Sequence, residues 1–171
     1  MTAVGQAFEK AAAQNRAALV GYLPAGFPTV DGGIAAILAM AEAGADIVEI
    51  GLPYSDPLID GPVIQQAVHR ALTGGVHVRD VLHTVEAVAA AGVPALVMTY
   101  WNPVEHYGVD AFARDLAAAG GSGTISLPED VGVAASSTPG SVGWVRSSMV
   151  RMPSSDRSSN GRYSTARRRK M

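Results

Sequence analysis

Short, almost fully apolar segments alternate with longer segments of helical spacing up to about residue 128, and this alternation limits the folds open to the chain. The apolar segments are 18–22, 47–50, 95–99 and 123–127. The segments with helical spacing are 30–43, 63–72, 78–91 and 110–119, and glycine follows each of them closely. Strands that are apolar on both faces and separated by helices predict a parallel α/β sheet covered by helices.

Two parallel architectures fit this order, a doubly wound open sheet and a (β/α)8 TIM barrel. A dinucleotide-binding open sheet carries a glycine-rich fingerprint directly after its first strand. The loop after Tyr22 holds Pro24, Gly26 and Pro28 instead. Polar groups collect at the carboxyl ends of the predicted strands, where barrels hold their active sites. The sequence therefore favours a partial (β/α)8 barrel of about four βα units.

The composition changes abruptly near residue 128. Residues 1–130 hold five basic and fourteen acidic side chains, whereas 131–171 hold eight basic side chains and one acidic one. No Leu, Ile or Phe follows Leu127, and ten of the last 41 residues are serine. Such a segment buries too little apolar surface to offset its ordering entropy. We expect half of a barrel domain at 1–128 and a disordered basic tail at 129–171.

The composition also excludes several classes of protein. The chain has no cysteine, which excludes a disulfide framework and a Cys-ligated metal site. Its first fifteen residues match neither a signal peptide nor a transit peptide. Its apolar stretches end well short of the ~20 residues that a bilayer span needs. These features predict a soluble cytoplasmic protein with no membrane partner.

One carboxylate, Glu49, lies inside an apolar segment between Val48 and Ile50. Desolvation in a buried strand raises the pKa of a carboxyl group toward neutrality, which suits a group that both gives and takes a proton. The same position also fits a structural carboxylate that accepts hydrogen bonds from a neighbouring loop. The strand context leaves both interpretations open.

A second carboxylate, Asp60, ends a loop that is rich in proline and glycine. The rigid residues predict a shaped loop in which Asp60 accepts a hydrogen bond from a ligand. Alternatively, Asp60 caps the helix that opens at Pro62, and the residues alone favour this cap. Asp56 in the same loop is either a turn former or a charge that faces a partner.

The stretch AGADIVEIGLPYSDPLIDGPVIQ, residues 43–65, is long and specific. It closely resembles the α subunit family of tryptophan synthase. The segments 21–28 and 98–103 resemble that family's first and third strand–loop junctions, and Arg70-Ala-Leu and 108–112 fit it as well. The resemblance covers residues 5–128.

The resemblance implies a carbon–carbon lyase that cleaves indole-3-glycerol phosphate into indole and glyceraldehyde 3-phosphate in tryptophan biosynthesis. It implies that Glu49 is the general acid–base residue and that Asp60 binds the indole N–H. Tyr22 and Tyr100 match positions that line the indole pocket, although each also fits an ordinary core aromatic. No metal and no organic cofactor is implied.

The resemblance also implies a protein partner. Residues 53–60, with Asp56 and Pro57, would face the tryptophan synthase β chain in an α2β2 assembly. A second function hypothesis is therefore a non-catalytic module that binds the β chain, and an inert fragment is the alternative to it. A different phosphate-barrel lyase or isomerase fits the PYSDP loop less well. Nucleic-acid binding through the basic run at 167–170 ranks last.

The resemblance stops where the composition changes. A full barrel of this kind has ~250 residues and holds phosphate with loops after its seventh and eighth strands. Only four such strands are predicted here. Open sheet edges and an uncovered inner face predict a marginal, aggregation-prone or self-associating fragment with impaired activity.

We predict that the tail after residue 128 arises from a shifted reading frame. The encoding DNA, read past codon 125 in its two other frames, should then show further alternating strands and helices with a glycine-rich phosphate loop. If neither frame encodes them, the hypothesis of a shifted reading frame is wrong.

Overall fold

The computed structural model describes residues 2–57 and 60–127, and the backbone of 144–146. Helices and strands alternate as the sequence predicts, with additional elements. The elements are α1 (Ala3–Ala13), β1 (Val20–Pro24), α2 (Val30–Glu42), β2 (Ile47–Gly51), α3 (Pro62–Thr73), α4 (Val78–Ala90), β3 (Ala95–Tyr100), α5 (Trp101–Tyr107), α6 (Val109–Ala118), β4 (Gly123–Leu127) and β5 (Trp144–Arg146).

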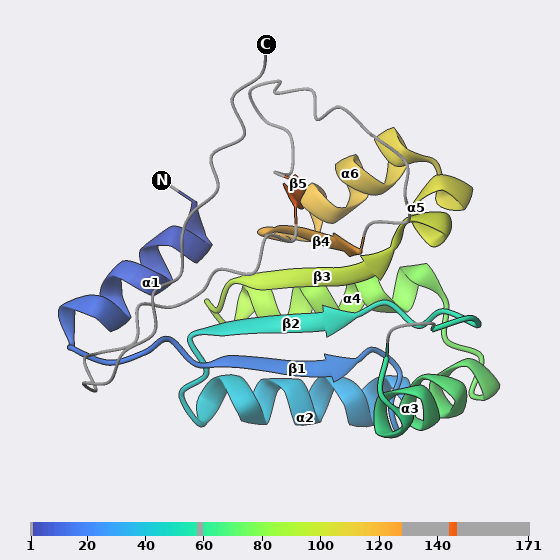
Figure 1. The fold of residues 1–171 in the computed structure, drawn as a ribbon, viewed down its shortest axis with the longest axis horizontal. Helices are drawn as coiled ribbons and strands as arrows, with labels where there is room; N and C mark the ends of the chain where they lie inside the picture. The colour runs from blue at the N-terminus through green and yellow to red at the C-terminus, as the bar shows by residue number, and fades with distance from the viewer. Residues whose placement is uncertain (1, 58–59, 128–143, 147–171) are drawn as a thin grey trace, which may run out of the picture.

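The strands form one parallel sheet in the order β1-β2-β3-β4-β5. In Figure 1 their arrows run side by side in one direction, so the carboxyl ends of β1, β2 and β3 meet at one edge. A doubly wound sheet reverses its strand order partway through, whereas strands of a barrel follow one another in sequence order. The observed order confirms the predicted α/β half-barrel with four βα units.

The hydrophobic core lies between one face of the sheet and the helices α2, α4 and α6. The residues of β2 and β3 on this face that belong to the core are fully buried, and the helices contribute Ile37, three valines of α4, and two residues of α6. The buried set includes Val48, Ile50, Ala95 and Val97 from the strands, and Ile37, Val81, Val85, Val88, Val104, Phe112 and Leu116 from the helices. These strand residues form the helix-facing side of strands that are apolar almost throughout.

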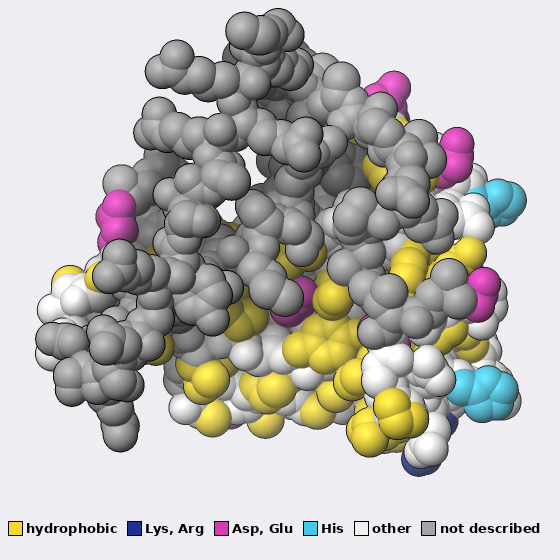
Figure 2. All heavy atoms as spheres, in the orientation of Figure 1, with side chains coloured by type: hydrophobic (Ala, Val, Ile, Leu, Met, Phe, Trp, Pro, Cys, Tyr) yellow, Lys and Arg dark blue, Asp and Glu magenta, His cyan; other side chains and the backbone are white. Residues whose placement is uncertain are grey.

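The opposite face of the sheet is covered less evenly. Figure 2 shows hydrophobic side chains along the part of this face that is not drawn grey, with an acidic side chain among them. At the start of β1, Leu19 is 58% exposed and Val20 is 42% exposed. Within the described residues, β1 pairs with β2 alone, so its outer edge carries no strand.

Two helices were absent from the sequence-based expectation. The alanine-rich α1 is capped by Thr2, whose hydroxyl accepts a hydrogen bond from the Gly5 amide at 3.1 Å. The segment expected to be a loop after Tyr100 forms the short helix α5. Pro103 lies in its first turn, where a missing N–H costs no helical hydrogen bond. None of the helices in the described part of the chain has the length and hydropathy needed to cross a bilayer.

The predicted tail and its boundary at residue 128 lie largely outside the described residues. Only residues 144–146 of the predicted tail are described, and they form β5. Their backbone pairs in parallel with β4, with Thr124 opposite Trp144 and Ser126 opposite Arg146. The division into a domain and a tail stays a prediction.

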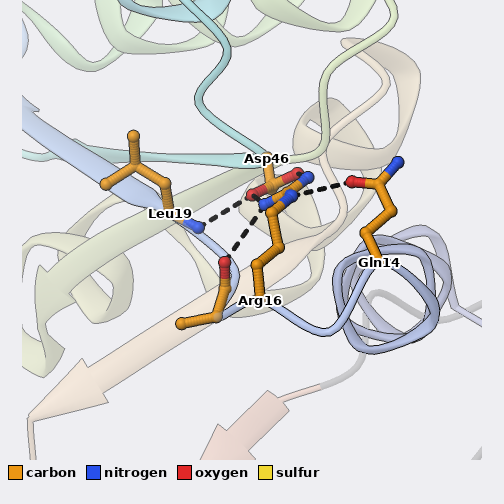
Figure 3. A network of polar contacts seen from close by, with 5 residues as sticks. Gln14, Arg16, Leu19 and Asp46 are labelled. Atoms are coloured by element: carbon orange, nitrogen blue, oxygen red, sulfur yellow. Dashed lines mark hydrogen bonds and ion pairs between the residues drawn. The ribbon is translucent and has the colours of Figure 1, made fainter.

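An ion pair fastens the segment after α1 to the amino-terminal edge of the sheet (Figure 3). The guanidinium of Arg16 donates to both carboxylate oxygens of Asp46, at 2.6 and 2.7 Å. The same carboxylate accepts a hydrogen bond from the Leu19 amide at 2.8 Å. The Arg16 side chain, followed by the Leu19 amide, holds the pKa of Asp46 well below its usual range. The bidentate pair therefore joins β1, β2 and the preceding loop at one point.

We predict that Arg16→Met lowers the thermal unfolding midpoint at pH 7 more than Arg79→Met does. The control residue is Arg79. Its Nε lies 3.9 Å from Oδ1 of Asp80, and its side chain is 80% exposed. Because folding lowers the pKa of Asp46, the stabilisation is complete above the ordinary aspartate pKa of about 3.9 and is lost as the pH falls below it. Unfolding midpoints from pH 2 to 8 for wild type and Asp46→Asn check this, and a gap that widens at low pH contradicts it.

Candidate active site

Two of the predicted site residues face each other across the first two strands. Tyr22 on β1 and Glu49 on β2 are register partners, and Leu96 on β3 lies opposite Glu49. The neighbours of Glu49 in its strand, Val48 and Ile50, are fully buried against the helices. Because side chains alternate along a strand, Glu49 and Tyr22 point to the face that would line the interior of a barrel.

The protonation of Glu49 is set by its burial. The side chain is half-buried, and desolvation raises the pKa of its carboxyl group above the ordinary glutamate value. Within the described residues, no hydrogen bond reaches this carboxylate, so the alternative of a structural carboxylate that holds a neighbouring loop has no contact to support it. A half-buried carboxyl group with a raised pKa holds its proton more tightly than an exposed glutamate does, which suits a group that must give a proton as well as take one.

Asp60 does not cap helix α3, contrary to the cap alternative that its residues favoured. The N-cap of α3 is Gly61, with Pro62 in the first turn, and no side chain caps this end. The Asp60 carboxylate instead accepts a long hydrogen bond, 3.4 Å, from the Tyr100 hydroxyl. Gln65 holds the backbone of this segment, since its amide nitrogen donates to the Asp60 carbonyl at 2.8 Å. The side chain is thus free of a capping role.

The charges of both carboxylates affect the pKa of Tyr22. Burial, followed by the charges of Asp60 and Glu49 and by Tyr100, raises the pKa of Tyr22 to about 12. Its hydroxyl lies so close to Gly51 that a β-carbon at that position would collide with it. Glycine at this position therefore lets the Tyr22 ring lie across β2, next to Glu49. Four predicted site residues, Tyr22, Glu49, Asp60 and Tyr100, are brought together at the carboxyl ends of three strands.

The two residues predicted to face a protein partner lie apart from this group. Asp56 is exposed and Pro57 is partly exposed, both in the loop between β2 and α3. Their interface role stays a prediction. Among the described residues, no group of three or more His, Asp or Glu side chains could hold a metal ion.

Two residues that sequence reasoning did not single out, Tyr54 and Asn102, also belong to the site. The ring of Tyr54 packs against the ring of Tyr100 with centroids 5.2 Å apart and planes tilted by 36°. The Asn102 amide donates to the Tyr54 hydroxyl at 2.9 Å. Both residues lie inside the motifs at 43–65 and 98–103, which was the available signal.

A hollow of about 460 Å³ lies beside the loop that follows β2. It is bounded by the residues after β2, the start of α4, and α5, and it contains neither Glu49 nor Asp60. Tyr54 and Asn102 lie on its wall. The hollow is therefore separate from the pair of carboxylates.

Sequential parallel strands, helices on one face, and titratable groups at the carboxyl ends define the first four units of a (β/α)8 barrel. The tryptophan synthase alpha chain family profile matches residues 8–135. This chain belongs to that family.

The relatives and solved structures agree with this assignment. The tryptophan synthase alpha chain of Salinispora arenicola is 66% identical over 126 residues, which cover 74% of this chain and 47% of the relative. That of Mycobacterium tuberculosis is 60% identical over 123 residues, 72% of this chain and 46% of the relative. This chain thus spans about half the length of the curated relatives it matches.

Among solved structures, the aminoacrylate-bound form of M. tuberculosis tryptophan synthase matches with a TM-score of 0.72 and 59% identity. The match covers 74% of this chain and 51% of that one. Tryptophan synthase subunit alpha from Legionella pneumophila matches with a TM-score of 0.71 and 37% identity, over 74% of this chain and 49% of that one.

We predict that Glu49→Gln stabilises the fold at pH 7, because it removes a charge that burial disfavours. Since folding raises the pKa of Glu49, the advantage of the variant is largest above that pKa and disappears as the pH falls below about 4.3, the ordinary glutamate value. Unfolding midpoints from pH 3 to 8 test this, with Glu86→Gln, whose side chain is 71% exposed, as the control. An unchanged midpoint at pH 7 would contradict it.

Proposed function

We propose that the described half-barrel carries the acid–base part of an active site that cleaves indole-3-glycerol phosphate into indole and glyceraldehyde 3-phosphate. The observation that carries the proposal is the place of Glu49. Its carboxyl group has a pKa raised by burial, and it lies on the barrel-facing side of β2 opposite Tyr22. Membership of the tryptophan synthase alpha chain family supports this substrate and this carbon–carbon lyase reaction.

The proposed reaction is a retro-aldol cleavage. Protonation of indole C3 turns the ring into an indolenine, and Glu49 is suited to supply that proton. Glu49, now a carboxylate, takes the proton of the adjacent side-chain hydroxyl; the carbon–carbon bond then breaks, which releases the aldehyde and returns the electron pair to the indole. Asp60 accepts a hydrogen bond from the indole N–H and stabilises positive charge on the ring. The rings of Tyr22 and Tyr100 line the pocket that holds the indole.

The proposal includes a protein partner, the tryptophan synthase β chain. The exposed loop residue Asp56 and its neighbour Pro57 are the contacts we propose. A second candidate function is a module that binds the β chain without cleaving substrate. Co-purification with a β chain and stimulation of its activity separate this module from an inert fragment. The cytoplasmic location predicted from the sequence stays a prediction.

We expect little or no indole release from the purified 171-residue chain, because phosphate-binding loops of such a barrel follow its seventh and eighth strands. A chimera tests the site itself. Residues 1–127 joined to the remaining half of the M. tuberculosis relative should release indole, and Glu49→Gln in that chimera should lower kcat by roughly 10²- to 10⁴-fold.

The exposed Glu86→Gln variant of the same chimera is the control and should keep its rate. Near-normal turnover by the 171-residue chain alone would overturn the expectation for this chain. An active chimera that tolerates Glu49→Gln would overturn the role of Glu49.

A further inference from the structure

A line of side chains from two segments leads to Asp60. The Asn102 amide donates to the Tyr54 hydroxyl at 2.9 Å, the Tyr54 ring packs on the Tyr100 ring at 5.2 Å, and the Tyr100 hydroxyl donates to Asp60 at 3.4 Å. Tyr54 and Asp60 belong to the connection between β2 and α3. Tyr100 and Asn102 belong to the junction of β3 with α5. The connection therefore contacts this junction through Tyr54 near one of its ends and through Asp60 near the other.

At the Asp60 end of the connection, the backbone and the carboxylate are held by different contacts. At the far end, Gln65 already fixes the backbone of the connection, through the Asp60 carbonyl at 2.8 Å and the Pro57 carbonyl at 3.3 Å. The carboxylate of Asp60 is held less firmly, since its hydrogen bond from Tyr100 is long. The position of the Tyr100 ring therefore decides whether this hydrogen bond forms. That ring is buried, and Tyr54 packs on it.

We propose that Tyr54 and Asn102 are positioning residues for Asp60: the hydrogen bond between them holds the Tyr54 ring against Tyr100, which in turn holds the Asp60 carboxylate. The role of Asp60 in binding an indole N–H rests on the proposed function, whereas the positioning rests on these contacts alone. A carboxylate that must meet one ring N–H needs a fixed place, and misplacement by about 1 Å is costly in a preorganised site.

The chain offers variants that separate the hydrogen bond from the ring contact. Tyr54→Phe keeps the ring and removes the hydroxyl. Asn102→Leu keeps the size of the side chain and removes the donor. Asn102→Asp restores a partner, because the Tyr54 hydroxyl can then donate to the carboxylate. Tyr107→Phe is the matched control, since its hydroxyl makes a 2.8 Å hydrogen bond to Asp115 on α6, away from Asp60.

The direct readout is the nuclear Overhauser effect between the Tyr100 ring protons and the Asp60 β-protons in the full chain. We expect it in the wild type, in Asn102→Asp and in Tyr107→Phe, and we expect it to weaken at least twofold in Tyr54→Phe and Asn102→Leu. An effect that is missing in the wild type, or that is equal in the wild type and Tyr54→Phe, overturns the proposal.

The second readout is indole affinity, measured by titration of the same five proteins and of the double variant Tyr54→Phe/Asn102→Leu. Loss of one hydrogen bond should weaken binding by roughly three- to tenfold in Tyr54→Phe and in Asn102→Leu. The double variant should be no weaker than either single one, because both changes break the same contact. Additive losses overturn the proposal. If the Overhauser pattern is as expected but the wild type binds no indole, the positioning stands and the proposed function fails for this chain.

Discussion

The in-register pairing of β1, β2 and β3 is the constraint on which the rest of the structure depends. It sets Tyr22, Glu49 and Leu96 at one level across three strands, and alternation then assigns each side chain to a face. Val48 and Ile50 enter the helical core, whereas Glu49 faces the barrel side. A slip of one residue would drive the carboxylate into the core and expose two of its most buried side chains. The same hydrophobic pattern that stabilises the sheet therefore also places the acid.

Much of this arrangement follows from the sequence, because strand and helix periods are local. The four long strands and the helices α2, α3, α4 and α6 lie where apolar spacing predicts them, within a few residues at each end. Helix α5 was missed because it is short, follows β3 without a loop, and holds Pro103 in its first turn. The residues taken alone favoured Asp60 as the cap of α3, whereas the N-cap is Gly61, because both residue types are acceptable caps before a proline. The contact of Tyr54 with Asn102 joins residues 48 apart, and no periodic signal reports it.

Stability and chemistry lie at opposite ends of the sheet. Arg16 and Asp46 fasten its amino-terminal edge, where a fixed, bidentate ion pair does not constrain the site. Glu49, Asp60 and the two tyrosines lie at or near the carboxyl ends, where loops differ most between barrels that share one scaffold. Glu49 itself shows the tension between the two demands, because the burial that raises its pKa also destabilises its charged form.

The strand order has a consequence for how the chain is built. Each of the strands β2, β3 and β4 pairs with the strand that precedes it. Every new βα unit therefore adds one strand beside the existing edge strand of the sheet. Each of these pairings joins two strands that follow one another in the chain with only one or two helices between them. A nascent chain can thus assemble this sheet in the direction of its synthesis, one unit at a time. Each unit then needs only the strand before it, and not the rest of the sheet, to find its place.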